Sequence, residues 1–577
     1  MKRLRLVLVL VLLLILAGVA WVWYATPAPV DLANYAPADA LVYVEFGNIA
    51  DVARTIQHTD IWKAAAPITG SKSGDSNRLF VAAARAGIGP IESVLFARTQ
   101  IALVVVGLNT SEENRDTLNV RPELALIAET HTQRWRTKPV MVEAVKWLAN
   151  SAYGASTCSG PDPDGDRVEC SIPGSDRKLI GMIYGTTIIL ANSEDALRSC
   201  VEVRGGRRPS IATDTEFQKT RSSVATPQSL SFGFVATGNS ARLFSWAAPL
   251  QMGFAPDNQQ LQQLLFTGAG KILRTISWTA VPAGGGIEDR FFFSLDPDVV
   301  ARLQPAFDTS QRDENIWKLV PDSFESLTIY RSRDPVAAWN SLDTTVSFKL
   351  DVVPAVFFGS LLKSSLLGYG IENPKAVLAA LSSPLLTMKT SEGAEGSILI
   401  ARVSDEALLR KAVQPQTDDG PKPQLLDGLQ TDPDPAKEFA AVFVEGYVLL
   451  GNTGNMRSCL AELRRGSAAI AEKAVADDKK NVQNSARENT AAIVTYANDE
   501  ARLTSFISTL SMLQGRSLSN EELGKLQSTF GNSSFAETET RLSSSGIERK
   551  TRSAFGQFST LISLLNPNPP NSLARQQ

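Results

Sequence analysis

The chain begins with a long apolar run, from Leu6 to Tyr24, that contains no charged side chain. As a helix this run is about 28 Å long, close to the roughly 30 Å thickness of the hydrocarbon core of a bilayer. Three basic residues precede it, and no other Lys or Arg occurs before Arg54. This charge asymmetry predicts a cytoplasmic tip and a transmembrane signal anchor in residues 1-25. The chain would then be a single-pass protein of the bacterial inner membrane, with its bulk periplasmic or otherwise extracytoplasmic. The alternative is a cleaved signal peptide, because Gly18-Val19-Ala20 is similar to a cleavage site.

Short matches recur along the rest of the chain, in the same order, and such internal repeats indicate a duplicated architecture. At a spacing of 259 or 260 residues, Arg198-Ser199-Cys200 recurs as Arg457-Ser458-Cys459, Ala241-Arg242-Leu243 as Ala501-Arg502-Leu503, and Gly286-Ile287-Glu288 as Gly546-Ile547-Glu548. One tripeptide match is easily a coincidence, but three at nearly one spacing are not. The pattern predicts two tandem, divergent copies of one exported domain, at residues 30-300 and 314-558.

Each predicted copy mixes strand-like and helix-like patterns. The apolar runs at 188–190 and 447–450 are followed by Asn-Ser and Asn-Thr, which can cap a helix. Near the end of each copy, at 275–295 and 535–555, two strand-like segments flank a turn with glycine, which is typical of an antiparallel hairpin. These patterns predict an α+β fold. The Pro-rich segment 566-577 is expected to be a disordered tail.

The opening of the first predicted copy reads Pro37-Ala38-Asp39-Ala40-Leu41-Val42-Tyr43-Val44, a short distance after the apolar run. It resembles a bacterial family of envelope-anchored proteins of unknown function, in which a Pro-Ala-Asp-x-x-x-Tyr strand opens the exported domain. The second copy departs from this motif with Pro321-Asp322-Ser323. The resemblance implies a location and a domain type, but no chemistry.

Composition narrows the classes of partner. With 44% hydrophobic and 20% charged residues and a formal net charge of -3, the chain is typical of globular proteins and has no basic excess for nucleic acid. Two histidines and four cysteines leave little room for His-based catalysis or thiolate metal sites. Cys158 and Cys170 flank a turn-rich segment, so we expect them to form a disulfide in an exported domain. Cys200 and Cys459 are expected to be buried as small apolar side chains.

The segment between Cys158 and Cys170 is rich in acids. Asp162, Asp164 and Asp166 alternate, and Glu169 follows, as oxygen ligands do in calcium loops. The glycine falls at the fourth position, however, whereas an EF-hand loop needs it at the sixth. A solvated acidic turn is therefore the preferred interpretation, no cofactor is expected, and calcium stays as an alternative.

The repeated tripeptides also repeat two charges. Arg242 with Glu288, and Arg502 with Glu548, are expected to form one structural ion pair in each copy. The prediction requires the charged groups to lie within about 6 Å of each other.

Enzyme motifs are missing from the sequence. Gly268-Ala269-Gly270-Lys271 lacks the first glycine and the Ser/Thr of a P-loop, and no G-x-S-x-G motif occurs. We nominate no catalytic residue and expect a non-catalytic envelope protein whose paired domains bind or scaffold another envelope component, through an envelope protein partner. Two alternatives stay open: a hydrolase with its site in one copy, and a carrier of a lipid or other apolar ligand between the domains. The sequence predicts no oligomeric state.

Overall fold

The computed structural model describes residues 29–563, apart from 69–98, 115–116, 133, 154–155, 161–165, 252–258, 310–312, 322–323, 350–354, 356–358, 361, 391–397, 415–421, 469–481, 483, 487, 514–516 and 531–534. The predicted membrane anchor (1-25) and the predicted tail (566-577) therefore lie outside the described residues. Within the described part, no helix combines the length and the apolar character needed to cross a bilayer.

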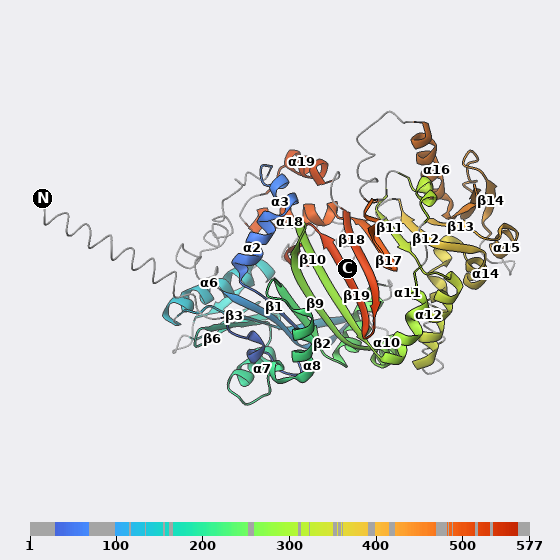
Figure 1. Ribbon diagram of the computed structural model, residues 1–577. Helices are drawn as coiled ribbons and strands as arrows, with labels where there is room; N and C mark the ends of the chain where they lie inside the picture. The colour runs from blue at the N-terminus through green and yellow to red at the C-terminus, as the bar shows by residue number, and fades with distance from the viewer. Residues whose placement is uncertain are drawn as a thin grey trace, which may run out of the picture.

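One large sheet of 19 strands organises the molecule (Figure 1). The strands of the first half are β1 (Val42–Phe46), β2 (Gln100–Asn114), β3 (Thr117–Glu129), β4 (Thr157–Ser159), β5 (Arg167–Ser171), β6 (Lys178–Tyr184), β7 (Thr187–Ala191), β8 (Ser231–Val235), β9 (Leu273–Ala283) and β10 (Gly286–Leu295). Their pairings place them in the order β4-β5-β6-β7-β3-β2-β1-β8-β9-β10, with every neighbour antiparallel.

The strands of the second half are β11 (Ser326–Tyr330), β12 (Leu381–Lys389), β13 (Ile398–Val403), β14 (Gln424–Asp427), β15 (Phe439–Val444), β16 (Tyr447–Asn452), β17 (Ile493–Asn498), β18 (Phe535–Ser543) and β19 (Gly546–Ser553). Their order is β14-β15-β16-β13-β12-β11-β17-β18-β19. From β5 and from β14 inward, both halves pair their strands in the same sequence. The difference is that β14 runs parallel to β15, whereas β5 is antiparallel to β6.

The two halves join where β10 pairs with β19 in the antiparallel sense. In this pairing Arg290 lies opposite Lys550, and these residues are 260 positions apart. Glycines begin both strands for a steric reason. A Cβ at Gly286 would overlap the carbonyl oxygen of Ser553, and one at Gly546 would overlap that of Phe293. Each half therefore needs a residue without a side chain where it meets the backbone of the other.

Helices cover both faces of the sheet. In the first half they are η1 (Leu32–Tyr35), α2 (Ile49–His58), α3 (Asp60–Ala65), α6 (Arg134–Tyr153), α7 (Glu194–Arg204), η2 (Ile211–Thr213), α8 (Thr215–Val224), α9 (Asn239–Gln251), α10 (Gln259–Ile272) and α11 (Pro297–Phe307). In the second half they are η3 (Asn315–Leu319), α12 (Pro335–Lys349), η4 (Leu367–Tyr369), α14 (Pro374–Ala379), α15 (Glu406–Ala412), α16 (Thr453–Ala468), α18 (Glu500–Leu513), α19 (Asn520–Phe530) and α20 (Gln557–Ser563). The predicted α+β class and both predicted hairpins, β9–β10 and β18–β19, are confirmed.

The helix after the buried strand β7 begins as its sequence predicts. The Ser193 hydroxyl accepts a hydrogen bond from the backbone N–H of Ala196, and Gly205 is the C-terminal cap of α7. One face of α7 packs on the sheet and buries Cys200 in a core with Ile127 and Phe217. On the opposite face of the sheet, α6 packs through Met141 and neighbouring residues.

Side chains of both halves share one core at the junction. Ile56 and Trp278 of the first half pack with Phe506, Phe530 and Phe555 of the second half. Figure 1 shows the consequence, because the blue helices α2 and α3 lie beside the orange-red α18 and α19, which are far away in sequence. Burial of these large side chains, together with the β10–β19 pairing, makes the two halves one packed unit.

Candidate functional site

An open pocket of about 790 Å³ lies in the first half, where η1, the end of β3, the start of β7 and the end of α7 meet. Its wall includes Tyr35, Glu129, His131, Arg204 and Arg208. These five residues place polar and charged groups in the pocket beside apolar ones such as Val30 and Val203, so a ligand with both polar and apolar parts fits it. None of these residues was predicted from the sequence to form a site.

Glu129, the last residue of β3, stiffens the wall of the pocket. The residue is only 1% exposed, and its carboxylate accepts hydrogen bonds from Thr187 Oγ1 (2.7 Å), from the Tyr35 hydroxyl (3.5 Å) and from the backbone N–H of His131 (2.9 Å). Thr187 lies directly opposite Glu129 in the β3–β7 pairing. A buried carboxylate needs such partners to offset its lost hydration. Glu129 therefore orders three elements around the pocket.

His131 holds a backbone conformation that is uncommon for a residue other than glycine. Its φ is 53°, and the hydrogen bond from its N–H to Glu129 helps to hold it there. The ring Nε2 lies 3.0 Å from Gln100 Oε1, and because an amide oxygen only accepts, Nε2 is the donor. Gln100 in turn bonds the backbone of Val30 in both directions. Residues that several contacts hold in an uncommon backbone conformation often occur at functional sites.

Arg204 is the last residue of α7, where the helix dipole favours a cation. Its guanidinium carbon lies 4.7 Å from the centre of the Tyr35 ring and 5.7 Å from that of Tyr184. Arg208, by contrast, donates to Ser199 Oγ (2.7 Å) and pairs with Asp39 (2.5 Å). Among the described residues, the guanidinium of Arg204 has aromatic neighbours but no hydrogen-bond acceptor.

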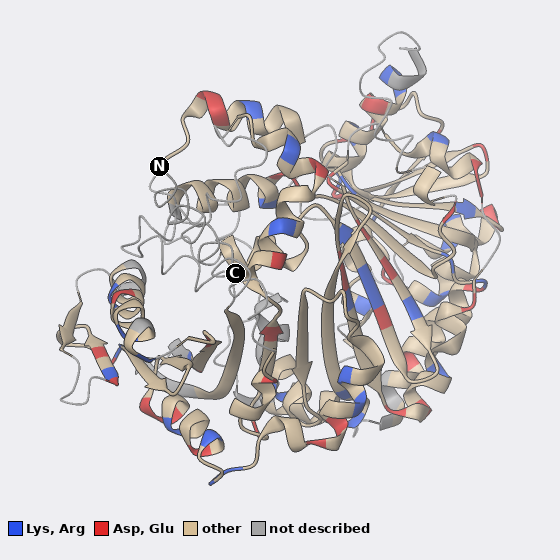
Figure 2. Cartoon of the chain, turned by 60° about the vertical axis from the view of Figure 1, so that its left-hand side comes forward, with Lys and Arg blue, Asp and Glu red and all other residues tan. Residues whose placement is uncertain are grey.

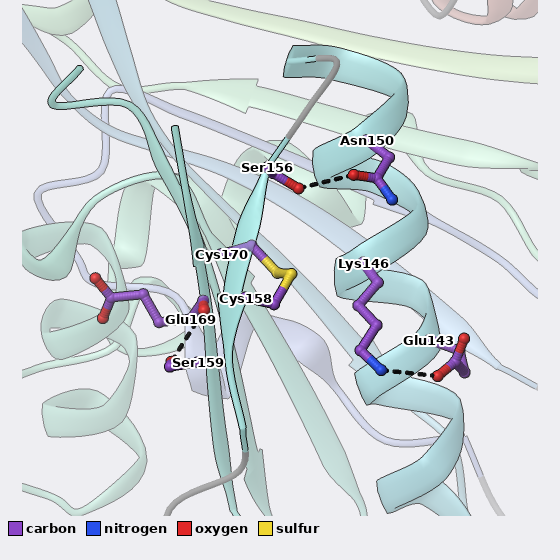
Figure 3. The surroundings of a disulfide bond; sticks show 8 residues. All are labelled: Glu143, Lys146, Asn150, Ser156, Cys158, Ser159, Glu169 and Cys170. Carbon is purple, nitrogen blue, oxygen red and sulfur yellow. Dashed lines mark hydrogen bonds and ion pairs between the residues drawn. A yellow bond between two sulfur atoms is a disulfide. The ribbon is translucent and has the colours of Figure 1, made fainter. Parts of the chain in front are cut away.

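The predicted disulfide is present between Cys158 and Cys170 (Figure 3). The two cysteines lie opposite each other on β4 and β5, beneath α6. Cys200 and Cys459 are buried and are not joined in a disulfide, and their burial was expected. Burial raises the pKa of the Cys200 thiol to about 12.

The acidic segment is described in part, because Asp162 and Asp164 lie outside the described residues. Asp166 pairs with Arg134 at 2.5 Å, and Glu169 pairs with Arg167 at 2.8 Å. Within the described part of the chain, no group of three or more His, Cys, Asp or Glu side chains is placed to hold a metal ion. The acids that are described thus have basic partners.

The predicted ion pairs are replaced by others. Glu288 pairs with Arg290 (2.6 Å) and, across the junction, with Arg552 (2.8 Å), instead of Arg242. Burial alone would raise the pKa of Glu288, but hydrogen bonds from these two arginines hold it below its usual value. The repeated tripeptides suggested a partner within the same half. They could not indicate Arg552, because Arg552 belongs to the other half.

In the second half, Arg502 pairs with Asp499 (2.6 Å) and Glu548 with Lys550 (3.4 Å), so Arg502 and Glu548 do not form the predicted pair. Asp499 lies three residues before Arg502, immediately before α18, and Lys550 lies two residues after Glu548 on β19. Each of these charges therefore has a partner close to it in sequence. Figure 2 shows bands of both charge signs across the central strands, where the pairs of β10, β18 and β19 lie.

Asp289 is the second buried acid at the junction. It is 0% exposed, and it accepts hydrogen bonds from Trp278 Nε1 (2.9 Å) and from the backbone N–H of Gln557 (2.9 Å). Burial raises the pKa of Asp289 to about 6, and the two hydrogen bonds offset only part of this rise. One carboxylate thus connects β9 and β10 of the first half with the start of α20.

Comparisons with known proteins give little to add. No family model matches the chain, and no curated protein matches it. Among solved structures, the chain is similar to "Structure of crystal form I of TP0453", at 12% identity over 48% of this chain and 88% of that chain, with a TM-score of 0.23. At this TM-score the similarity supports no conclusion about fold or function.

Proposed function

We propose that the chain is a non-catalytic binding protein of the bacterial cell envelope. It consists of two divergent copies of one α+β domain, anchored in the inner membrane by residues 1-25, and it presents them to another envelope component. The matching order of strand pairing in the halves supports the duplication. So does the position of Arg290 opposite Lys550, at the spacing of the repeated tripeptides. The opening motif and the apolar N-terminal run support the location.

The pocket of the first half carries the binding role. Its carboxylate, Glu129, is 1% exposed and accepts hydrogen bonds from Tyr35, His131 and Thr187, so it serves as a structural acceptor and is a poor candidate for a general base. The donor on His131 Nε2 is engaged with Gln100. An open, polar pocket with fixed walls and one unmatched guanidinium is suited to holding a ligand.

Native mass spectrometry of the full-length chain in a neutral detergent tests this function. The chain is incubated with a total extract of envelope lipids and small molecules, and retained masses are compared between variants. Asn34→Trp places a large side chain at the exposed lip of the pocket, and Lys219→Trp places one on the exposed surface of α8 as the matched control.

We expect wild type and Lys219→Trp to retain a ligand that Asn34→Trp loses. A wild-type chain that retains nothing, yet turns over substrates in a broad hydrolase screen, contradicts the proposal and favours the enzyme.

A further inference from the structure

We propose that the pocket binds its ligand through a monoanionic pair of oxygens, a carboxylate or a phosphodiester, and that Arg204 is the residue that takes it. The inference rests on the binding function proposed for the same pocket, and it names the chemistry of the ligand. It follows from how the charged groups around the pocket are already partnered, from the geometry of Arg204, and from a comparison with the second half.

Arg204 is held in a way that leaves its donors available. The guanidinium lies over the ring of Tyr35 and near that of Tyr184, at 4.7 and 5.7 Å from their centres. Contact with an aromatic ring favours a guanidinium over its face, and the N–H donors lie along the edges of the guanidinium plane, where a ligand can reach them. A planar fork of this kind matches the two oxygens of a carboxylate or phosphate group.

The neighbouring polar groups are engaged with the protein. Arg208 pairs with Asp39 and donates to Ser199, and the Asn34 amide donates to the backbone carbonyl of Asp31. The Thr213 hydroxyl donates to the backbone carbonyl of Ser210. Arg204 thus supplies the cationic donors that remain for a ligand.

The balance of charge selects the kind of anion. Glu129 lies in the same wall as Arg204, and the charge of Arg208 is matched by Asp39. One unmatched guanidinium beside one carboxylate favours an anion with a single charge over one with two, because like charges at close range repel. A phosphodiester or a carboxylate therefore fits better than a terminal phosphate.

The second half shows what the same place looks like without a pocket. Alignment of the strand pairs β3–β7 and β13–β16 by their registers puts Arg402 where Glu129 is and Tyr447 where Thr187 is. The Tyr447 hydroxyl reaches across to Asp313 at 2.8 Å, and burial together with this carboxylate raises the pKa of Tyr447 to about 12.

Arg464, near the corresponding end of α16, also has partners within the second half. On α16, Arg464 donates to the carbonyl of Leu429 (2.5 Å) and pairs with Asp432 (2.7 Å). The second half thus fills the place with its own side chains. Among the residues that the structure describes, we therefore place the anion site in the first half.

Calorimetric titration of the full-length chain in neutral detergent tests the inference, with dimethyl phosphate and acetate as monoanions and methyl phosphate as a dianion. Arg204→Gln removes the fork, and Arg204→Lys keeps the charge without the planar geometry. Arg207→Gln is the matched control, because Arg207 is an exposed neighbour that does not line the pocket. Phosphatidylglycerol in mixed micelles with the same detergent, compared with soluble glycerophosphoglycerol, distinguishes a lipid headgroup from a soluble source.

We expect one site per chain for a monoanion, with affinity about tenfold or more lower in Arg204→Gln and unchanged in Arg207→Gln. Arg204→Lys should lie between them. Equal affinity in wild type and Arg204→Gln, equal loss in Arg204→Gln and Arg207→Gln, or tighter binding of methyl phosphate overturns the inference. If a ligand is displaced by Asn34→Trp but is indifferent to Arg204→Gln, the binding function stands and the anion chemistry is wrong.

Discussion

Replacement of Asp289 by asparagine should change how stability depends on pH. Asp289 is fully buried where β9 and β10 meet α20, and burial raises its pKa from 3.8 to about 6. A rise of roughly two pKa units corresponds to about 3 kcal/mol. Because the folded pKa is the higher one, this stability is fully present below about pH 4, the unfolded pKa, and is lost as pH rises through about 6. The neutral amide side chain of the variant has no such dependence.

The same substitution has a second, constant effect. Asp289 accepts hydrogen bonds from Trp278 and from the backbone of Gln557, and an amide offers one oxygen in place of two. We therefore expect Asp289→Asn to be less stable than wild type at pH 4, and the deficit to shrink by about 3 kcal/mol, or to reverse, by pH 7. Urea unfolding of both proteins from pH 4 to 8 measures the difference. A deficit that is the same at every pH refutes the reasoning.

Three further substitutions test the packing. Gly546→Ala should destabilise the chain by more than about 1 kcal/mol, because its Cβ overlaps the Phe293 carbonyl at the junction, whereas Gly524→Ala, with open space around it, should be neutral or stabilising in urea unfolding. Cys158→Ser should cost about 3 kcal/mol, since the disulfide closes a loop with a separation of 12 residues, and a reductant should lower the wild-type urea midpoint but not that of the variant. Phe506→Ala should lower the free energy of unfolding by about 3 to 5 kcal/mol, because the Phe506 ring is fully buried and its centre lies 4.4 Å from that of Phe555 in the shared core. Thermal or urea unfolding measures this loss, and a loss below about 1 kcal/mol contradicts that packing.

Local patterns predicted the α+β class and several elements of the fold. Alternating apolar residues and glycine turns indicated both hairpins, and the cap at Ser193 marked the start of α7. Local patterns do not indicate which strand pairs with the edge strand of each half. Nothing in the sequence near β10 says that it pairs with β19, because that contact spans the whole second half of the chain. The predicted pair of Arg242 with Glu288 failed for this reason, since Arg552 arrives from the other half.

The disulfide could be predicted because its cysteines flank a single turn, so their closeness needs no knowledge of the tertiary fold. The pocket could not. Glu129, His131 and Arg204 come from separate segments, and each looks ordinary in its own surroundings. The arginines on either side of Gly205-Gly206 indicated a cluster of positive charge in the sequence. Only the fold shows that one of them, Arg204, lies against two tyrosines.

The junction between the halves is the feature on which the account of this molecule depends most. Arg290→Cys combined with Lys550→Cys tests it in the full-length chain, by peptide mapping of disulfides after mild oxidation. Directly opposite residues on paired strands lie within the reach of a disulfide, whereas Glu539 lies one strand further along the same row, about 10 Å from Arg290. We predict a disulfide between positions 290 and 550, and none when Arg290→Cys is combined with Glu539→Cys. No cross-link between 290 and 550, or equal cross-linking of both pairs, contradicts the joining of the two halves through β10 and β19.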